Sequence, residues 1–130
     1  MNPEVHQVER ATPVLPVRNL KRSILFYTET LGFILDWGGE DGSPICSVSK
    51  DGCGIMLSQN TGATPGVWVW IGVEDDSLFH LYRSRGVKVR QEPKNFSWAY
   101  EMKFEDIDGN VLWLGTESKQ NMPLEDKQDG

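Results

Sequence analysis

The five tryptophans of this 130-residue chain are the residues whose type and spacing point most directly to chemistry. Two of them, Trp68 and Trp70, alternate with aliphatic residues in the segment VWVWIGV (67–73). Side chains on a strand alternate between its two faces, so both indoles share one face with Gly72. The aliphatic face suits packing under a helix. We therefore expect the indoles on the concave side of the sheet, where flat rings stack on planar molecules.

The other tryptophans extend this expectation to a binding site. An aromatic stack adds about 0.5–1.5 kcal/mol beyond area burial and a cation over an indole about 0.5–2 kcal/mol, whereas micromolar binding needs about 8 kcal/mol. Acidic or hydrogen-bonding groups must therefore contribute, and the acidic residues beside Trp37 and Trp98 favour a planar, cationic ligand. A core role for Trp70 and Trp113 stays open as an alternative. The predicted ligand-binding residues are Trp37, Trp68, Trp70, Trp98, Trp113, Asp36, Glu40, Asp41 and Glu101.

Residues for catalysis are few. A metal site of catalytic type needs about three imidazole or carboxylate ligands, and the chain has only His6, in its polar N-terminal arm, and His80, within a predicted helix. There is no G-x-S-x-G motif, no Gly-rich phosphate loop and no cysteine with a plausible histidine partner. Cys46 and Cys53 have neither a redox-motif nor a disulfide-framework spacing, so we expect two reduced, partly buried thiols. The sequence predicts no catalytic residue, no metal and no cofactor.

Composition narrows the partners. The net charge of −6 and the pI near 4.8 disfavour nucleic acid and would attract a cationic small molecule. No apolar run reaches the roughly 18 residues of a membrane span, and the first residues lack the apolar core of a secretion signal. We expect no membrane partner and a cytoplasmic location.

The periodicity predicts the same order of elements twice. In the first half we expect a strand at 12–17, a helix at 20–31 capped by Asn19 and stopped by Gly32, and strands at 33–37, 45–49 and 53–58. In the second half we expect a strand at 67–73, a helix at 75–85 stopped by Gly86, a strand at 87–91 and two strands around a turn at 108–109. Equivalent landmarks recur after 56 or 57 positions, which favours a duplicated module.

The predicted fold class is α+β, with two βαβββ modules forming a curved mixed sheet around a cleft. We expect a flexible N-terminal arm at 1–10, the first module at 11–60, a linker at 61–66, the second module at 67–116, and a flexible C-terminal tail at 117–130.

Three segments resemble the vicinal-oxygen-chelate superfamily (glyoxalase, bleomycin resistance, extradiol dioxygenase): TPVLPVRNLKRSILFYTETLGF (12–33), VWVWIGVEDDSLFHLY (67–82) and WAYEMKFEDIDGNVLWL (98–114). Within it the chain is most similar to bleomycin-resistance proteins. That resemblance implies a homodimer, with exchange of an N-terminal strand as one arrangement, which binds cationic drugs in grooves between subunits. An aromatic residue like Trp98 then stacks on the drug. The chain departs from these proteins in its longer 38–44 loop and in the residues after Trp98, which leaves the identity of the drug open.

The superfamily's enzymes hold a divalent metal with imidazole and carboxylate side chains. The resemblance places Thr12, Trp68 and Trp113 at those ligand positions. We therefore predict a metal-free small-molecule binding protein that acts by sequestration. The resemblance implies antibiotic resistance of the bleomycin-resistance kind. Two alternatives remain: a metal-dependent lyase or dioxygenase of the same superfamily, and a protein-interaction module without a small ligand.

Overall fold

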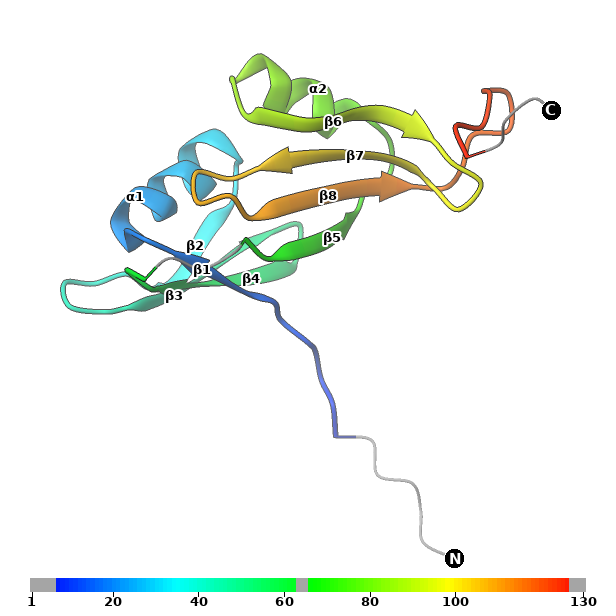
Figure 1. Ribbon diagram of the computed structural model, residues 1–130. Coiled ribbons are helices and arrows are strands. Elements are labelled where there is room, and N and C mark those ends of the chain that lie inside the picture. The colour runs from blue at the N-terminus through cyan, green and yellow to red at the C-terminus, as the bar shows by residue number, and fades with distance from the viewer. Residues whose placement is uncertain (1–6, 63–65, 127–130) are drawn as a thin grey trace, which may run out of the picture.

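The computed structural model describes residues 7–62 and 66–126, which form two modules with the same order of elements (Figure 1). The first module contains β1 (Val14–Val17), α1 (Leu20–Leu25), η1 (Phe26–Thr30), β2 (Ile34–Gly38), β3 (Ile45–Lys50) and β4 (Cys53–Gln59). The second contains β5 (Trp68–Gly72), α2 (Ser77–Ser84), β6 (Lys88–Asn95), β7 (Tyr100–Glu105) and β8 (Val111–Thr116). The duplicated βαβββ order is the one that the sequence predicts.

Each module folds into a four-stranded mixed sheet. The strand orders are β1-β4-β3-β2 and β5-β8-β7-β6, so the first strand of each module pairs with its last. That pairing is parallel in both sheets, whereas the other neighbours are antiparallel. The fold class is therefore α+β, as expected.

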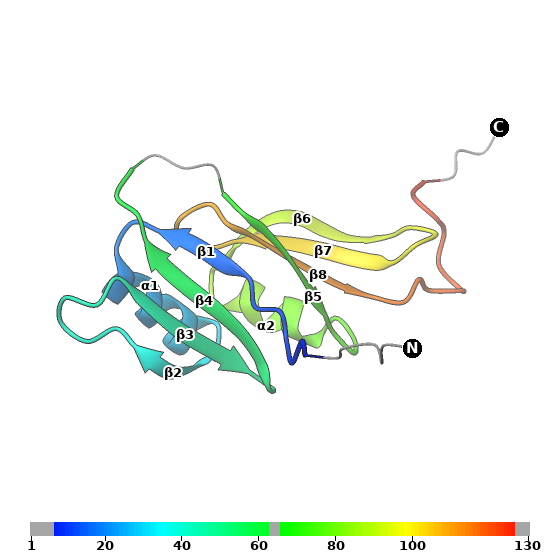
Figure 2. The same cartoon turned by 90° about the horizontal axis from the view of Figure 1, so that it is seen from below.

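The core lies between the sheets and the two helices and is shared by both modules. Strands lie in front of both helices in the view of Figure 2, so each sheet has one face toward a helix and one face away from it. On the second sheet, Phe79 of α2 stacks on Phe104 of β7 with ring centroids 4.9 Å apart. None of the helices among residues 7–62 and 66–126 is long and apolar enough to cross a membrane.

The first helix differs from the predicted single helix over 20–31. Asn19 caps it as expected, since its Oδ1 accepts a hydrogen bond from the Arg22 N–H at 3.1 Å. After Leu25 the coil widens into the π-helical η1, where the Leu31 N–H donates to the Phe26 carbonyl five residues back. Gly32, with φ of +79°, ends the segment.

The second helix is shorter than the predicted 75–85. The Asp75 carboxylate accepts a hydrogen bond from the Ser77 N–H at 2.9 Å, so this acid lies outside the helix at its start. A hydrogen bond from the Ser77 hydroxyl, together with this one from the Ser77 N–H, holds the pKa of Asp75 below its usual value. Gly86, with φ of +78°, follows the helix as expected.

The turn between β7 and β8 joins the two modules. The buried Asp106 carboxylate accepts hydrogen bonds from the Tyr27 hydroxyl at 2.8 Å and from the Asn110 N–H at 2.9 Å. The Asn110 side chain also donates to the Pro16 carbonyl at 2.9 Å. Burial raises the pKa of Asp106 against the opposing effect of these bonds. The D-x-D-G-N turn is therefore a structural connection between the modules.

The chain ends differ in their contacts. Residues 7–10 are exposed and run away from the sheets in Figure 1, while residues 1–6, with His6, and residues 63–65 of the predicted linker lie outside the described part. In the segment predicted as a C-terminal tail, the Lys119 N–H donates to Asn95 Oδ1 at 2.7 Å. The buried Asn95 amide donates in turn to the carbonyls of Lys119 and Met122.

Candidate functional site

The tryptophans of the second sheet form a cluster on the face turned away from α2. Trp68 and Trp70 are 50% and 47% exposed, while Val69 and Ile71 between them pack against the core. In the parallel β5–β8 register Trp70 lies beside Trp113, which brings the three rings together. The structure therefore places the indoles on the exposed face that alternation along β5 predicts. We call Trp68, Trp70 and Trp113 the indole cluster.

A glycine of β8 provides the surface on which Trp70 rests. Gly72 and Gly115 are neighbours in the β5–β8 register. A Cβ on Gly115 would lie 2.0 Å from Cη2 of Trp70, so only a residue without a side chain leaves room for the ring. Trp70 and Trp113 then meet edge to face, with centroids 5.0 Å apart at 85°. Gly115 is a site residue that the sequence analysis missed.

A buried carboxylate holds the indoles in place. Glu101 is 2% exposed and accepts hydrogen bonds from the indole N–H of Trp98, at 2.8 Å, and from that of Trp113. Its Oε2 lies 3.4 Å from Lys103 Nζ. These partners offset the cost of burying a charge. The sequence analysis assigned Glu101 to the ligand, but the structure engages this carboxylate with the protein's own donors.

Two cations of the protein lie over the indoles, and sequence reasoning missed both. Lys103 Nζ is 5.3 Å from the centroid of Trp68 and 5.2 Å from that of Trp113, and it donates to Gln91 Oε1 at 2.8 Å. The Arg90 guanidinium carbon is 5.1 Å from the Trp68 centroid. The period of two from Glu101 places Lys103 on the same face, which is a signal that the sequence does contain.

Trp98 forms the edge of the site in the connection between β6 and β7. Its ring stacks on Phe96 with centroids 4.7 Å apart and an interplanar angle of 6°. The residue is 62% exposed, so much of it remains open beyond the contact with Phe96. Through Glu101 this outer aromatic is connected to Trp113 of the indole cluster.

The predicted residues of the first module do not join the indole cluster. Trp37 is 50% exposed on β2, the edge strand of the other sheet. Asp36 lies at a bulge beside it and accepts a hydrogen bond from Ser49 Oγ at 2.9 Å. Asp41 forms an ion pair with Lys21 Nζ at 2.7 Å.

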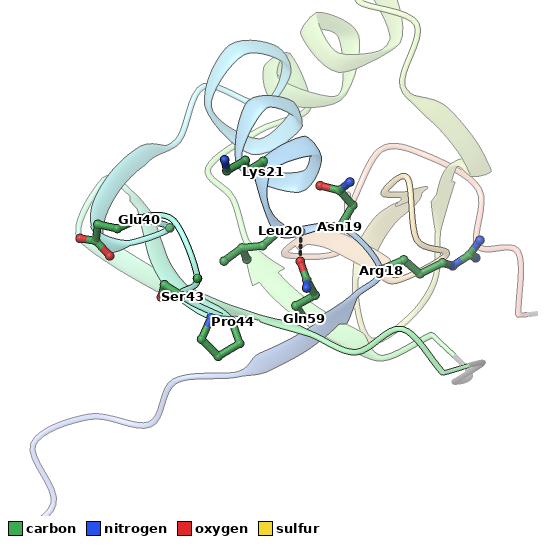
Figure 3. Close-up of a pocket in the computed structure, with 10 residues that line it drawn as sticks. Arg18, Asn19, Leu20, Lys21, Glu40, Ser43, Pro44 and Gln59 are labelled. Atoms are coloured by element: carbon green, nitrogen blue, oxygen red, sulfur yellow. Dashed lines mark hydrogen bonds between the residues drawn. The ribbon is translucent and has the colours of Figure 1, made fainter.

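Glu40 lines a separate hollow beside the start of α1. Figure 3 shows Glu40 there with Lys21 and Gln59, whose Oε1 accepts a hydrogen bond from the Leu20 N–H at 2.9 Å. No tryptophan lines this hollow. Of the acidic residues predicted to neutralise a ligand, Asp36, Glu40 and Asp41 therefore lie on the first module, and Glu101 alone lies at the indole cluster.

Trp68 and Trp113, at two of the positions that the resemblance assigns to metal ligands, do not fit a metal ion. An indole N–H is a donor with no lone pair to offer, and at Trp113 it is bonded to Glu101. Within residues 7–62 and 66–126 no three histidine, cysteine, aspartate or glutamate side chains are grouped as metal ligands. We derive no chemical step through a metal.

Comparison with known proteins gives a family match and several structural matches. Residues 5–114 match the model described as Glyoxalase/Bleomycin resistance protein/Dioxygenase superfamily. A search of curated proteins finds no match.

Among solved structures, the bleomycin resistance determinant encoded on transposon Tn5 aligns with a TM-score of 0.74 at 20% identity, over 85% of this chain and 98% of its own. TnmS3, an antibiotic binding protein from Streptomyces sp. CB03234, aligns with a TM-score of 0.72 at 27% identity, over 90% of this chain and 100% of its own. TioX from Micromonospora sp. ML1 aligns with a TM-score of 0.73 at 15% identity, over 85% of this chain and 99% of its own.

Proposed function

Because the chain belongs to the Glyoxalase/Bleomycin resistance protein/Dioxygenase superfamily, we propose that it binds a planar, antibiotic-like small molecule and acts by sequestration. The mechanism is steric. A flat ligand held against the indoles cannot reach its target, and no covalent step is required. We place this sequestration in the cytoplasm.

The observation that carries the proposal is the preassembled indole cluster. Trp68 and Trp70 are half exposed on a sheet face that neither α1 nor α2, the α-helices of the described residues, covers. Gly115 leaves room for the Trp70 ring, and Glu101 orients Trp113. Rings that are already fixed lose little conformational freedom on binding, so each stack keeps most of its contribution. The likeness to TnmS3, an antibiotic binding protein at 27% identity, supports a ligand of the antibiotic kind.

We further propose that the working form is a homodimer. The indole face is an open sheet surface, and large apolar residues are also exposed on the first sheet, with Ile34 at 69% and Val14 at 47%. A drug-sized ligand in a specific site has most of its surface buried, which one open face cannot achieve. The first sheet of a second copy would provide the opposite wall, and Trp37 lies on that sheet. Exchange of the N-terminal strand remains one way to form such a dimer.

The openness of the face also favours the second candidate, a protein-interaction module that uses exposed aromatics against a partner. The two functions differ in what saturates the site. A planar compound saturates a small-molecule binder at one ligand per groove. The same compound does not saturate an interaction module.

Tryptophan fluorescence titration of the full chain with planar aromatic antibiotics, bleomycin included, tests the proposal. We expect saturable quenching that Trp70→Ala weakens and that Leu81→Ala, an exposed apolar residue on α2, leaves unchanged. Absence of saturable quenching by every compound at millimolar concentration would refute small-molecule binding. Light scattering with and without ligand gives the oligomeric state, and a monomer in both conditions would refute the dimer.

A further inference from the structure

The proposed binding site differs in charge from the rest of the molecule. The whole chain carries −6. At the indole cluster, however, the charged side chains that contact the rings are the cations Arg90 and Lys103 and the carboxylate Glu101. A second carboxylate, Glu105, pairs with Arg90 and with Lys88.

Both carboxylates are already engaged. Glu101 is buried and accepts from two indoles while pairing with Lys103. Glu105 pairs with Lys88 at 2.7 Å and with Arg90 at 3.3 Å. A cationic ligand would therefore find both of these carboxylates already paired with groups of the protein.

The cation positions over the rings are also taken. Arg90 lies over Trp68, and Lys103 lies near the centroids of both Trp68 and Trp113. A ligand ammonium over Trp68 or Trp113 would therefore meet a like charge of the protein instead of an unpaired ring face. At these two rings the protein's own cations therefore disfavour the positive ligand charge that the sequence predicts.

We propose that the ligand of the indole cluster is a planar aromatic compound with an anionic oxygen at its edge, a carboxylate or phenolate, which Arg90 and Lys103 recognise. The inference rests on the proposed binding function. The Arg90 side chain is 44% exposed and contacts Glu105 through Nη1, which leaves other donors of its planar fork for a ligand. Lys103 is only 16% exposed and provides a fixed positive charge between two rings. The aromatic part of the ligand stacks on the exposed indoles while its oxygen edge meets the cations.

Three matched compounds test the charge preference: naphthalene carboxylate, its neutral carboxamide and its aminomethyl analogue, titrated calorimetrically into the full chain at low salt. We expect the carboxylate to bind at least about tenfold more tightly than the amine, with the amide between them. Arg90→Gln should remove at least about half of that preference on a logarithmic scale and leave amide binding within about twofold.

Arg83→Gln is the matched control. Arg83 lies on α2, and like Arg90 it lies over an aromatic ring, that of Phe79, and pairs with a glutamate, Glu92. It changes the net charge equally and should leave the preference unaltered. Lys103→Met is a less direct variant because it removes the cation beside buried Glu101, so its stability must be measured with its binding.

The outcomes separate the two proposals. If none of the three compounds binds up to millimolar concentration, the binding function itself fails. If they bind but the amine is equal to or tighter than the carboxylate, or if Arg90→Gln and Arg83→Gln behave alike, the anionic ligand is wrong and the binding function stands.

Discussion

Gly115→Ala tests whether the indole cluster is built as described. The added Cβ would lie 2.0, 2.6 and 2.7 Å from three carbons of the Trp70 benzo ring, far inside contact distance, so the ring must leave its position over β8. Because Trp70 is 47% exposed, the indole moves into solvent and the sheet is preserved. Gly115 does not have a positive φ, so alanine fits the backbone.

The size of the effect follows from the contacts that the ring loses. One aromatic contact with the ligand contributes about 0.5–1.5 kcal/mol, so affinity should fall about two- to twelvefold. Stability should change little, since alanine in a strand gains about 0.5–1 kcal/mol over glycine, which offsets part of the lost packing against Trp113.

Two glycines serve as controls for this substitution. A Cβ on Gly72 would lie 3.8 Å from Trp70 Nε1, an ordinary contact, and one on Gly54 of β4 would lie 4.0 Å from the nearest atom. Gly72→Ala and Gly54→Ala should therefore keep binding within about twofold. Ligand titration and near-ultraviolet circular dichroism of the indoles are the assays. Unchanged binding and an unchanged indole spectrum in Gly115→Ala would show that Trp70 does not rest on Gly115.

Three further predictions concern other parts of the molecule. Trp98→Ala removes an exposed ring of the site and should weaken binding of a planar ligand at least about tenfold in the same titration; a loss below twofold would exclude it from the site. A thiol reagent at neutral pH should modify exposed Cys53 at once and Cys46 only on unfolding, because Cys46 is fully buried and burial raises its pKa; two equally fast thiols would contradict this. Burial raises the pKa of Tyr82 from 10.0 to about 12, so the folded state holds the phenol proton more tightly than the unfolded state. The free energy of unfolding should therefore fall as pH rises from about 10 toward about 12, and Tyr82→Phe should flatten that fall in urea titrations.

The fold and the indole face are readable from the sequence because they depend on local period. Alternation along 67–73 separates the indoles from the aliphatic residues, and the structure places them on opposite faces. Asn19 marks a helix start because its own side chain accepts a hydrogen bond from the helix. Gly32 and Gly86 mark helix ends because glycine readily adopts a positive φ. The widening into η1 was missed, since a shift from four- to five-residue hydrogen bonding leaves the apolar spacing nearly unchanged.

The charge of the site could not be predicted from the local period of the sequence. The partners of Lys103 come from three other strands, with Trp68 on β5, Trp113 on β8 and Gln91 on β6, so its position depends on strand order. Glu101 was correctly singled out beside Trp98, but its burial depends on the same pairing. Acids near an indole in the sequence, such as Asp41, instead pair with cations of their own module.

Glu101 has a consequence for how the site responds to change. One carboxylate accepts from the outer Trp98 through Oε1 and from the inner Trp113 through Oε2, so both rings are aligned by the same side chain. A substitution at either ring alters the hydrogen bonding of the other across the strand. Effects of paired substitutions at these positions will then not add, and a molecule that tilts the outer ring will be sensed at the inner one.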